Sequence, residues 1–482
     1  MYIGIDLGTS GVKVVLLDEQ QQIVATTHRA LSISRPKPLW SEQHPSEWWQ
    51  ATDEAMSELA ATHKLDAVKA IGLTGQMHGA TLLDKQDNVL APAILWNDGR
   101  SARECEELEQ AVANSRKITG NIMMPGFTAP KLKWMAKHQP QIFEQVAKVL
   151  LPKDYLRLQL TGEYASDMSD ASGTMWLNVG KRQWSTELLA ACQLDLSQMP
   201  MLFEGNQITG YLRPSLAQKW KLNAVPVIAG GGDNAAGAIG IGLHKTGQAM
   251  LSLGTSGVYF VVTDQFLSNP SQAVHSFCHA LPHRWHLMSV ILSAASAVDW
   301  ATKALGFANV AQLFQAVENE PSFTDLLFLP YLSGERTPHN DPNAKGAFWG
   351  LTHNDNPSTM AKAVIEGVSF ALAQGIQALD SSGVAAEKIT LIGGGAKSHY
   401  WRQLLADISG KTFEYRVGGD IGPALGTAKL AQMAVNPQQS INEICQPLML
   451  EQRYQPNLQR HQQFLAKQEK FTELYQRLKG FL

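Results

Sequence analysis

The chain has 482 residues, of which 44% are hydrophobic and 17% are charged, and its formal net charge is −3. This composition excludes a mainly disordered chain and a collagen-like chain, and the small net charge gives no reason to expect nucleic acid or an anionic membrane as a partner. The length exceeds what one hydrophobic core usually organises, so two domains of similar size are expected.

The first predicted element is a β-hairpin. Residues 2–7 and 12–17 are β-rich, and the sequence GTSG between them is rich in turn formers. The six residues LGTSGV at 7–12 return unchanged at 253–258, again between two β-rich runs. A strand, turn and strand repeated about half a chain apart favour duplicated domains, each contributing one hairpin.

Mixed helical and strand patterns follow the first hairpin. Residues 46–63 have the spacing of an amphipathic helix, with Ser46 as the predicted N-cap. Residues 225–242, VPVIAGGGDNAAGAIGIG, indicate a buried strand, a glycine loop and a helix of small residues. The domain boundary is expected directly after this segment, which gives domains at 1–243 and 244–482.

The second half repeats this mixture of elements. Helices are predicted over 359–379 and 400–409, and a buried strand in ITLIGGG at 389–395. The polar tail from residue 450 onward is expected to form one or two surface helices. The predicted fold class is therefore α/β, with two domains packed together about a cleft.

Neither export nor membrane insertion is predicted. The chain begins with the strand-like MYIGIDLG rather than a signal peptide, and no apolar stretch approaches the about 18 residues that span a bilayer. The four cysteines lie far apart and form no CxxC pair, as is typical of reduced thiols. A soluble, cytoplasmic protein is expected.

The two GTSG turns are candidate phosphate-binding loops. Glycine lets an anion approach the backbone, and a tight turn exposes N–H groups beside the threonine and serine hydroxyls. The alternative is that both turns are ordinary hairpin ends, where Gly, Ser and Thr are common, and that the nearby lysine is a surface residue. The residues concerned are Gly8, Thr9, Ser10 and Lys13, and Gly254, Thr255 and Ser256.

Two aspartates are candidate catalytic residues. Asp6 lies just before the first turn, where a carboxylate would repel a polyphosphate unless a cation intervened; Mg²⁺ usually binds one or two carboxylates together with phosphate oxygens and water. Asp233, in GGGDN, follows a buried strand and precedes a helix. It could be a general base that accepts a substrate hydroxyl proton, or a helix N-cap, and spacing alone does not choose between these roles.

Three further patterns are weaker. Gly393, Gly394 and Lys397, in LIGGGAKS, suit a nucleotide at a helix start, and GGDIGPALG at 418–426 could complete an adenosine pocket. The run HSFCHALPHRWH has spacing that would allow zinc, but Pro282 favours a hairpin with its side chains on both faces. Core positions are expected for Trp96, Trp134 and Trp176, with the alternative that sugar sites use tryptophan faces.

Together these motifs resemble the FGGY carbohydrate kinases, within the actin, hexokinase and Hsp70 ATPase superfamily. The resemblance covers essentially the whole chain. GIDLGTSGVK and LSLGTSG are similar to the phosphate motifs of this family, GGGDN to its catalytic segment, and LIGGGAKS to its adenosine motif. The segments at 126–138 and 346–367 are similar to its two signatures. The resemblance implies two ribonuclease-H-like α/β domains flanking a deep cleft.

The resemblance also implies an activity. The segments LTGQMHGATLLD and AILWNDGR resemble members that phosphorylate D-xylulose with ATP and Mg²⁺, whereas glycerol kinases typically carry arginine and glutamate in place of Met77 and His78. The sugar would then lie in the first domain near Met77, His78, Asp233 and Asn234. Asp233 would be the general base, Asp6 would lie on the metal side, and ATP would bind mainly the second domain.

Several alternatives stay open within this resemblance. L-ribulose, glycerol or gluconate could replace D-xylulose as the acceptor. A non-kinase ATPase of the actin and Hsp70 superfamily is also conceivable, although it would need a peptide-binding domain or a polymer interface. A homodimer is expected only by analogy with the family.

Overall fold

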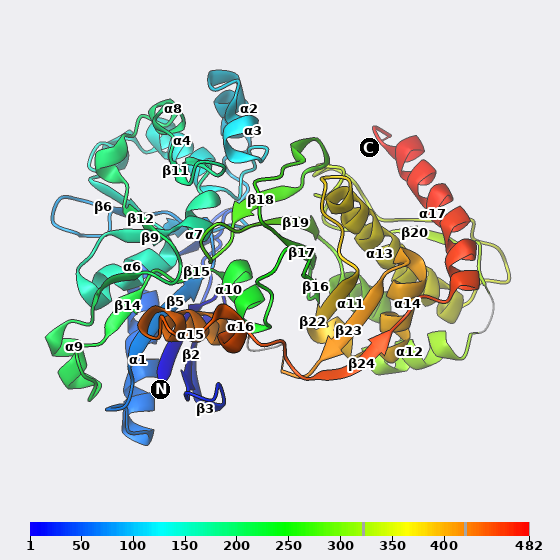
Figure 1. Ribbon diagram of the computed structural model, residues 1–482. Coiled ribbons are helices and arrows are strands. Elements are labelled where there is room, and N and C mark those ends of the chain that lie inside the picture. The colour runs from blue at the N-terminus through cyan, green and yellow to red at the C-terminus, as the bar shows by residue number, and fades with distance from the viewer. Residues whose placement is uncertain (321–322, 419–421, 482) are drawn as a thin grey trace.

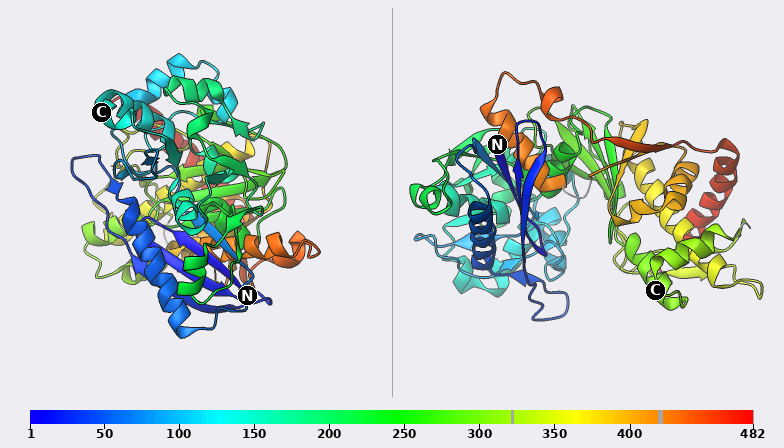
Figure 2. Two further views of the ribbon diagram at one scale, coloured as in Figure 1. Left: turned by 90° about the vertical axis from the view of Figure 1, so that its left-hand side faces the viewer. Right: turned by 90° about the horizontal axis from the view of Figure 1, so that it is seen from below.

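The computed structural model describes residues 1–320, 323–418 and 422–481. These residues form two lobes, each containing one seven-stranded β-sheet with helices packed against it (Figure 1). The same two lobes stand side by side when the molecule is seen from below (Figure 2).

The first sheet lies in the N-terminal lobe. Its strands run in the order β13 (Ile208–Tyr211), β14 (Pro226–Ile228), β5 (Ala70–Gly75), β1 (Tyr2–Leu7), β2 (Gly11–Leu17) and β3 (Ile23–Ala30), and β15 (Gly231–Gly232) also pairs with β5. The predicted hairpin is confirmed, because β1 and β2 are antiparallel neighbours. β1 pairs with β5 in parallel, and both strands are apolar along nearly their whole length because helices cover both faces of the sheet.

Helices from both halves of the sequence cover this sheet. Ile3 and Ile5 share a core with α1 (Pro45–Thr62), whereas Tyr2 shares a core on the opposite face with α15 (Gly422–Val435). α15 also packs against α10 (Asp233–Gly240), as Figure 1 shows. α15 approaches β1 so closely that a Cβ at Gly4, in β1, would lie 1.9 Å from the carbonyl oxygen of Ala424. The boundary after residue 243 stays a prediction, since one helix of the second half belongs to the core of the first lobe.

The second sheet repeats the plan of the first. Its order is β18 (His275–Cys278), β19 (Trp285–Ile291), β17 (Gly257–Thr263), β16 (Ala249–Leu253), β22 (Lys388–Ile392), β23 (Thr412–Arg416) and β24 (Leu450–Tyr454). β16 and β17 form an antiparallel hairpin, and β16 pairs with β22 in parallel, as β1 does with β2 and β5. The sequence repeat therefore corresponds to a repeat of structure.

The predicted helices are present with shifted ends. The second lobe contains α11 (Ala295–Ala304), α12 (Val310–Glu318), α13 (Pro357–Asp380), α14 (His399–Ser409) and α17 (Leu458–Leu478). Ser46 is not the N-cap of α1: His44 holds that position, Pro45 follows it, and His44 Nδ1 accepts a hydrogen bond from the Ser46 N–H at 3.3 Å. The tail predicted as surface helices from residue 450 onward begins instead with a strand of the second sheet, β24. A single helix, α17, follows it and buries Phe464 and Phe471.

Shorter elements complete the described chain. In the first half these are β4 (Glu42–Gln43), β6 (Thr81–Leu83), β7 (Ala93–Ile94), α2 (Ala102–Ala111), α3 (Ser115–Thr119), α4 (Thr128–His138), α5 (Pro140–Phe143), β8 (Lys148–Leu150), α6 (Pro152–Thr161), β9 (Ala165–Asp167), α7 (Met168–Ser172), β10 (Leu177–Asn178), β11 (Gln183–Trp184), α8 (Thr186–Ala191), η1 (Leu196–Gln198), β12 (Met201–Phe203) and α9 (Pro214–Lys219). In the second half they are η2 (Pro270–Gln272), β20 (Leu327–Leu329), β21 (Ala347–Trp349), η3 (Gly394–Lys397) and α16 (Ile441–Ile444).

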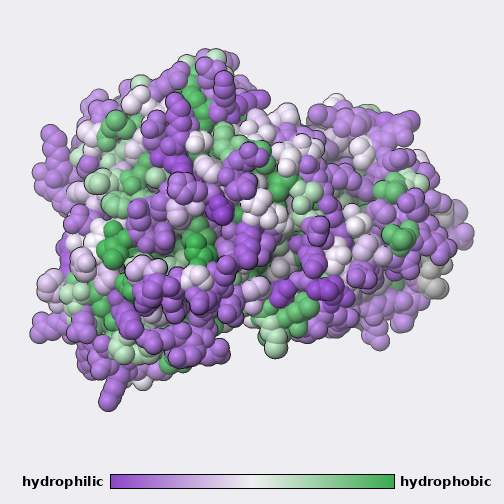
Figure 3. Space-filling model, in the orientation of Figure 1, coloured by the Kyte–Doolittle hydropathy of each residue, from purple (hydrophilic) through white to green (hydrophobic). Residues whose placement is uncertain are grey.

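The face of the molecule drawn in Figure 3 is mainly polar. On the face drawn in Figure 3, hydrophobic residues gather in small groups separated by hydrophilic ones. Within the described ranges, no helix combines the length and the apolar character needed to cross a membrane.

Candidate active site

Three strands of the first sheet end beside one another and carry the predicted catalytic residues. Asp6 in β1 is paired with Thr74 in β5, and Thr74 is paired on its other side with Gly231 in β15. Asp233 directly follows β15 and is the first residue of α10. Met77 and His78 follow the end of β5. Parallel pairing thus brings residues from distant parts of the sequence to one edge of the sheet.

Asp6 has a carboxylate that suits a cation. Its Oδ1 atom is buried and has no hydrogen-bond partner among the described residues. Burial, and then the charge of Asp233, raise the pKa of Asp6 to about 7, while the charge of Lys13 opposes this shift. An unpartnered buried oxygen beside a second carboxylate is a position where a divalent cation would relieve both burial and repulsion.

Asp233 is not the N-cap residue of α10, because Gly232 holds that position. Its Oδ1 accepts hydrogen bonds from the backbone N–H of Asn234 at 2.7 Å and from Asn234 Nδ2 at 2.9 Å. Burial raises the pKa of Asp233 to about 6, although both hydrogen bonds from Asn234 oppose the rise. A carboxylate in this range is ionised at neutral pH and still basic enough to accept a proton.

Met77 and His78 lie against the Asp233 segment and α7. A Cβ at Gly232 would lie 2.8 Å from the sulfur of Met77, and His78 Nδ1 lies 3.0 Å from the carbonyl oxygen of Gly173. Burial, and then the charge of Lys131, lower the pKa of His78 to about 3, so the ring is neutral. Because a carbonyl only accepts, the proton of the neutral ring is assigned to Nδ1, which leaves Nε2 as an acceptor.

The first GTSG turn is held by residues that the sequence did not indicate. Thr9 Oγ1 donates to Gln76 Oε1 and accepts from Trp96 Nε1, both at 3.0 Å, and Gln43 Nε2 donates to the Thr9 carbonyl at 2.7 Å. The Gly8 N–H closes the turn by donating to the Gly11 carbonyl. The hydroxyl of Thr9 therefore connects the turn to the loop that follows β7.

The expectation that all three tryptophans belong to the core is wrong for one of them. Trp134 and Trp176 are buried, but Trp96 is 42% exposed. The hydrogen bond from its indole to Thr9 keeps it beside the turn. Residue type alone did not distinguish this tryptophan from the other two.

The second GTSG turn opens onto a cavity of about 740 Å³ in the C-terminal lobe. Gly254 and Thr255 line it together with Gly394 and Lys397, which begin and end η3. The sequence-predicted residues of two separate motifs therefore meet at one cavity. Neither Ser256 nor Gly393 lines it; Gly393 has φ = +90° and turns the chain from β22 into η3. The other walls are formed by Leu253, Ala295, Val298, Asp299, Val310, Ala311, Phe314, Gln315, Glu318, Gly395, Ser398, His399 and Trp401.

Apolar and polar residues are mixed around this cavity in a way that suits a nucleoside. Val298, Val310 and Phe314 provide apolar surface, and Asp299 and Gln315 provide hydrogen-bonding groups. Of the predicted GGDIGPALG segment, residues 419–421 lie outside the described residues.

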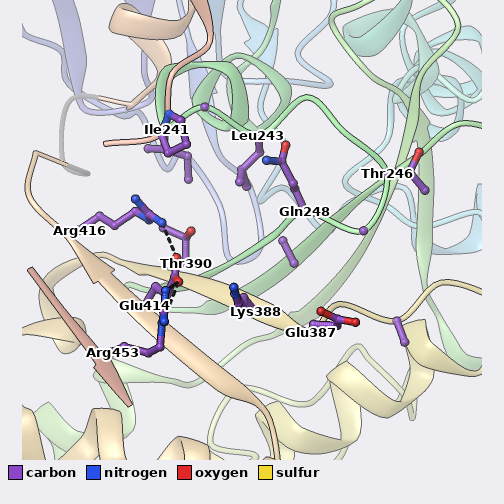
Figure 4. A pocket seen from close by; sticks show the side chains of 15 residues that line it. Ile241, Leu243, Thr246, Gln248, Glu387, Lys388, Thr390, Glu414, Arg416 and Arg453 are labelled. Carbon is purple, nitrogen blue, oxygen red and sulfur yellow. Dashed lines mark hydrogen bonds and ion pairs between the residues drawn. The ribbon is translucent and has the colours of Figure 1, made fainter. Parts of the chain in front are cut away.

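Another cavity, of about 570 Å³, lies at the segment that joins the lobes (Figure 4). The chain from Ile241 to Ala249, which connects α10 to β16, forms one side. On the other side Glu414 is held between Arg416 and Arg453. The residues predicted to bind sugar, metal or nucleotide all lie elsewhere.

The histidine-rich run forms the predicted hairpin. β18 and β19 are antiparallel, with Phe277 opposite His286, and Pro282 lies in the turn between them. In the part of the chain that the structure describes, no group of three or more His, Cys, Asp or Glu side chains is arranged to hold a metal ion. The run in question contains His275, Cys278, His279, His283 and His286.

The two lobes built on one sheet plan agree with the two-domain carbohydrate kinase fold that the sequence motifs predicted. The N-terminal domain of the FGGY family of carbohydrate kinases matches residues 1–240, and the C-terminal domain matches residues 249–435. The chain therefore belongs to the FGGY family of carbohydrate kinases.

Individual relatives are also similar over their full length. The xylulose kinase of Escherichia coli (strain K12) is 61% identical over 479 residues, which cover 99% of each chain, and that of Klebsiella pneumoniae is 58% identical over 483 residues, which cover 100% of each chain. The crystal structure of a xyloylose kinase from Brucella ovis matches with a TM-score of 0.95 and 47% identity, over 100% of both chains. These comparisons confirm the expected family and the expected two-domain fold.

Proposed function

We propose that this enzyme transfers the γ-phosphoryl group of ATP to the C5 hydroxyl of D-xylulose, forming D-xylulose 5-phosphate and ADP. The observation that carries the proposal is the pair of carboxylates, Asp6 and Asp233, at one edge of the first sheet. The 61% identity to a xylulose kinase supports the choice of sugar.

Asp233 is the general base in this proposal. It accepts the proton of the C5 hydroxyl as that oxygen attacks the γ-phosphorus, and the bond from phosphorus to the β,γ-bridging oxygen of ATP breaks. The two hydrogen bonds from Asn234 hold Oδ1, so that Oδ2 is the atom available to the substrate. The raised pKa of Asp233, about 6, suits a base at neutral pH.

Asp6 would hold the Mg²⁺ ion, directly or through water. Its unpartnered, buried Oδ1 fits a cation, whose chemistry here would be neutralisation of phosphate charge. Lys13, opposite Asp6 in the hairpin ladder, contributes a further positive charge on the same side.

ATP would occupy the cavity of the second lobe. Its base would contact Val298, Val310 and Phe314, and its ribose and phosphates would pass Gly394 and Lys397 toward the two GTSG turns. Gly8 and Gly254 shape the turns, since their N–H groups donate within them to Gly11 and Ser256. The backbone N–H groups of Thr9 and Ser10, and of Thr255 and Ser256, would then bind phosphate oxygens.

D-xylulose would bind at the first sheet. The neutral His78 can accept a hydrogen bond from a sugar hydroxyl at Nε2, and Asn234 can contact a neighbouring hydroxyl. Met77 would form one wall of the sugar site. The partly exposed side chain of Trp96 would offer an apolar surface for the carbon chain. Closure of the lobes around both substrates would exclude water, the competing nucleophile.

Two properties of the whole protein belong to the proposal. A cytoplasmic location agrees with the four cysteines, which are buried free thiols. A homodimer is proposed by analogy with the family alone, and the mass of the protein in solution would decide it.

The proposal is tested by coupled measurement of ADP release with Mg-ATP and one acceptor at a time: D-xylulose, L-ribulose, glycerol or gluconate. We expect the highest kcat/KM with D-xylulose and a product phosphorylated at C5. A higher value with another acceptor would reassign the sugar. ADP release of equal rate without any acceptor would indicate a non-kinase ATPase.

A further inference from the structure

A cluster of charged side chains lies fully buried behind the segment that carries Asp233. Lys153, in α6, forms ion pairs with Asp154 at 2.7 Å, Asp167 at 2.9 Å and Asp170 at 3.1 Å. Arg157, one turn further along α6, lies 3.8 Å from Asp154. All five side chains are 0% exposed.

The cluster contains three carboxyl groups and two cations. Burial raises the pKa of Asp170 well above its usual value, and the charges of Asp154 and Asp167 raise it further, although Lys153 opposes them. Buried ion clusters of this kind contribute little net stability compared with apolar side chains of similar volume.

The cluster contacts the Asp233 segment at two places. Arg157 donates to the carbonyl oxygens of Ile228 and Ala229, both at 2.5 Å, at the end of β14. Ser169 Oγ accepts the N–H of Gly232 at 3.0 Å and donates to Asp167, the residue that Lys153 holds. A chain of contacts thus runs from Lys153 through Asp167 and Ser169 to the residue directly before Asp233.

We propose that Lys153, Asp167 and Ser169 are positioning residues that set the direction of the Asp233 carboxylate through the N–H of Gly232. This inference rests on the proposed role of Asp233 as the base. The backbone just before this point is closely packed. A Cβ at Gly230 would lie 1.7 Å from the Leu73 carbonyl oxygen, and φ of Gly230 is +75°. Gly232 directly precedes Asp233, so loss of the Ser169 hydrogen bond removes a restraint one residue from the reacting group.

The test uses two serines of the same helix. Replacing Lys153 would leave buried carboxylates unpaired and could prevent folding, so Ser169→Ala is the informative variant. Its matched control is Ser172→Ala: Ser172 Oγ also accepts a backbone N–H at 3.0 Å, but from Cys278 in β18 rather than from the Asp233 segment. Both variants remove one buried acceptor from α7, and both should lower Tm by a similar amount.

The two variants should differ in catalysis and in local exchange. We expect Ser169→Ala to reduce kcat for D-xylulose about 10- to 100-fold with little change in KM for ATP. The acid limb of its profile of kcat/KM against pH should shift to higher pH. Amide hydrogen exchange at Gly231 to Asn234 should accelerate. Ser172→Ala should retain kcat, the profile and the slow exchange of that segment.

Equal kcat values and equal exchange in the two variants would overturn the inference. Exchange is measured without substrate, so it still tests the positioning contact if the wild type phosphorylates no sugar. In that case the proposed function would fail, while the exchange result would decide whether Ser169 restrains the segment.

Discussion

Asp6 and Asp233 lie at the same edge of the first sheet, separated by strand β5, and the charge of Asp233 raises the pKa of Asp6. The two carboxylates have different surroundings. Asp233 receives two hydrogen bonds from Asn234, whereas Asp6 Oδ1 receives none from the described residues. This difference suits one carboxylate for proton transfer and the other for a cation, and several predictions depend on it.

Asp233→Asn should lower kcat by about 10²–10⁴-fold or more, because the amide cannot accept the hydroxyl proton. Asparagine keeps an oxygen that can accept the N–H of Asn234, so the start of α10 should be retained. The measurement is steady-state sugar phosphorylation, with circular dichroism as the test of folding. Asp195→Asn, at the N-cap of η1, is the control and should retain full activity. Near-normal turnover of Asp233→Asn would reassign Asp233 to a structural role.

The kcat/KM for D-xylulose should fall about tenfold per pH unit below about pH 6. The base must be ionised, and burial raises the pKa of Asp233 to about 6, so protonation below that pH removes the active form. The profile should be recorded at saturating Mg-ATP. A rate that stays constant down to pH 5 would contradict the assignment.

Asp233→Asn should also stabilise the protein at pH 8. The folded pKa of Asp233, about 6, lies above the about 3.9 of an exposed aspartate, so the folded state is favoured at low pH and loses this contribution as pH rises through 6. Removing the buried charge should raise the free energy of unfolding at pH 8 by on the order of 2–3 kcal/mol. The gain should vanish toward pH 4.

Denaturant unfolding at both pH values measures this effect. Asp195→Asn should give no gain at pH 8, since hydrogen bonds from Ser197 hold the pKa of Asp195 below its usual value. Destabilisation by Asp233→Asn at pH 8 would show that the ionised carboxylate contributes to stability instead.

Gly394→Val should raise KM for ATP about tenfold or more while leaving KM for D-xylulose unchanged. A Cβ at Gly394 meets no atom within 4 Å, so the new side chain enters the cavity without displacing the protein. Tm should therefore stay close to that of the wild type. An unchanged KM for ATP would place the nucleotide outside this cavity.

The two GTSG threonines should respond differently to valine, which has the same shape without the hydroxyl. Thr9→Val breaks the contacts with Gln76 and Trp96 and should lower the free energy of unfolding by about 1–2 kcal/mol and raise KM for D-xylulose. Thr255→Val, at an exposed position that lines the ATP cavity, should change only KM for ATP. Identical effects of both substitutions on both KM values would contradict separate roles.

Much of the candidate site could be predicted from local sequence. Glycine-rich turns, and an aspartate at the end of a strand, are short patterns whose chemistry is visible in the residues themselves. Gln76, Gln43 and Trp96 were missed because they act through contacts with Thr9 that only strand pairing creates. The buried charges of Lys153 and Asp167 resemble surface residues until α6 and β9 are packed together.

The repeated sequence LGTSGV separates what local sequence determines from what the tertiary structure determines. By itself it determined a glycine-rich turn between two strands, at both of its positions, because glycine and the β-rich flanks allow little else. The pairing was decided elsewhere: Leu7 lies opposite Val12, whereas Leu253 lies opposite Gly257, one residue out of register. The carbonyl of Ser10 accepts the N–H of Leu31, next to β3, whereas that of Thr255 accepts the N–H of Ala294, at the start of α11. A backbone turn takes the register that satisfies its neighbours, and those neighbours come from distant parts of the chain.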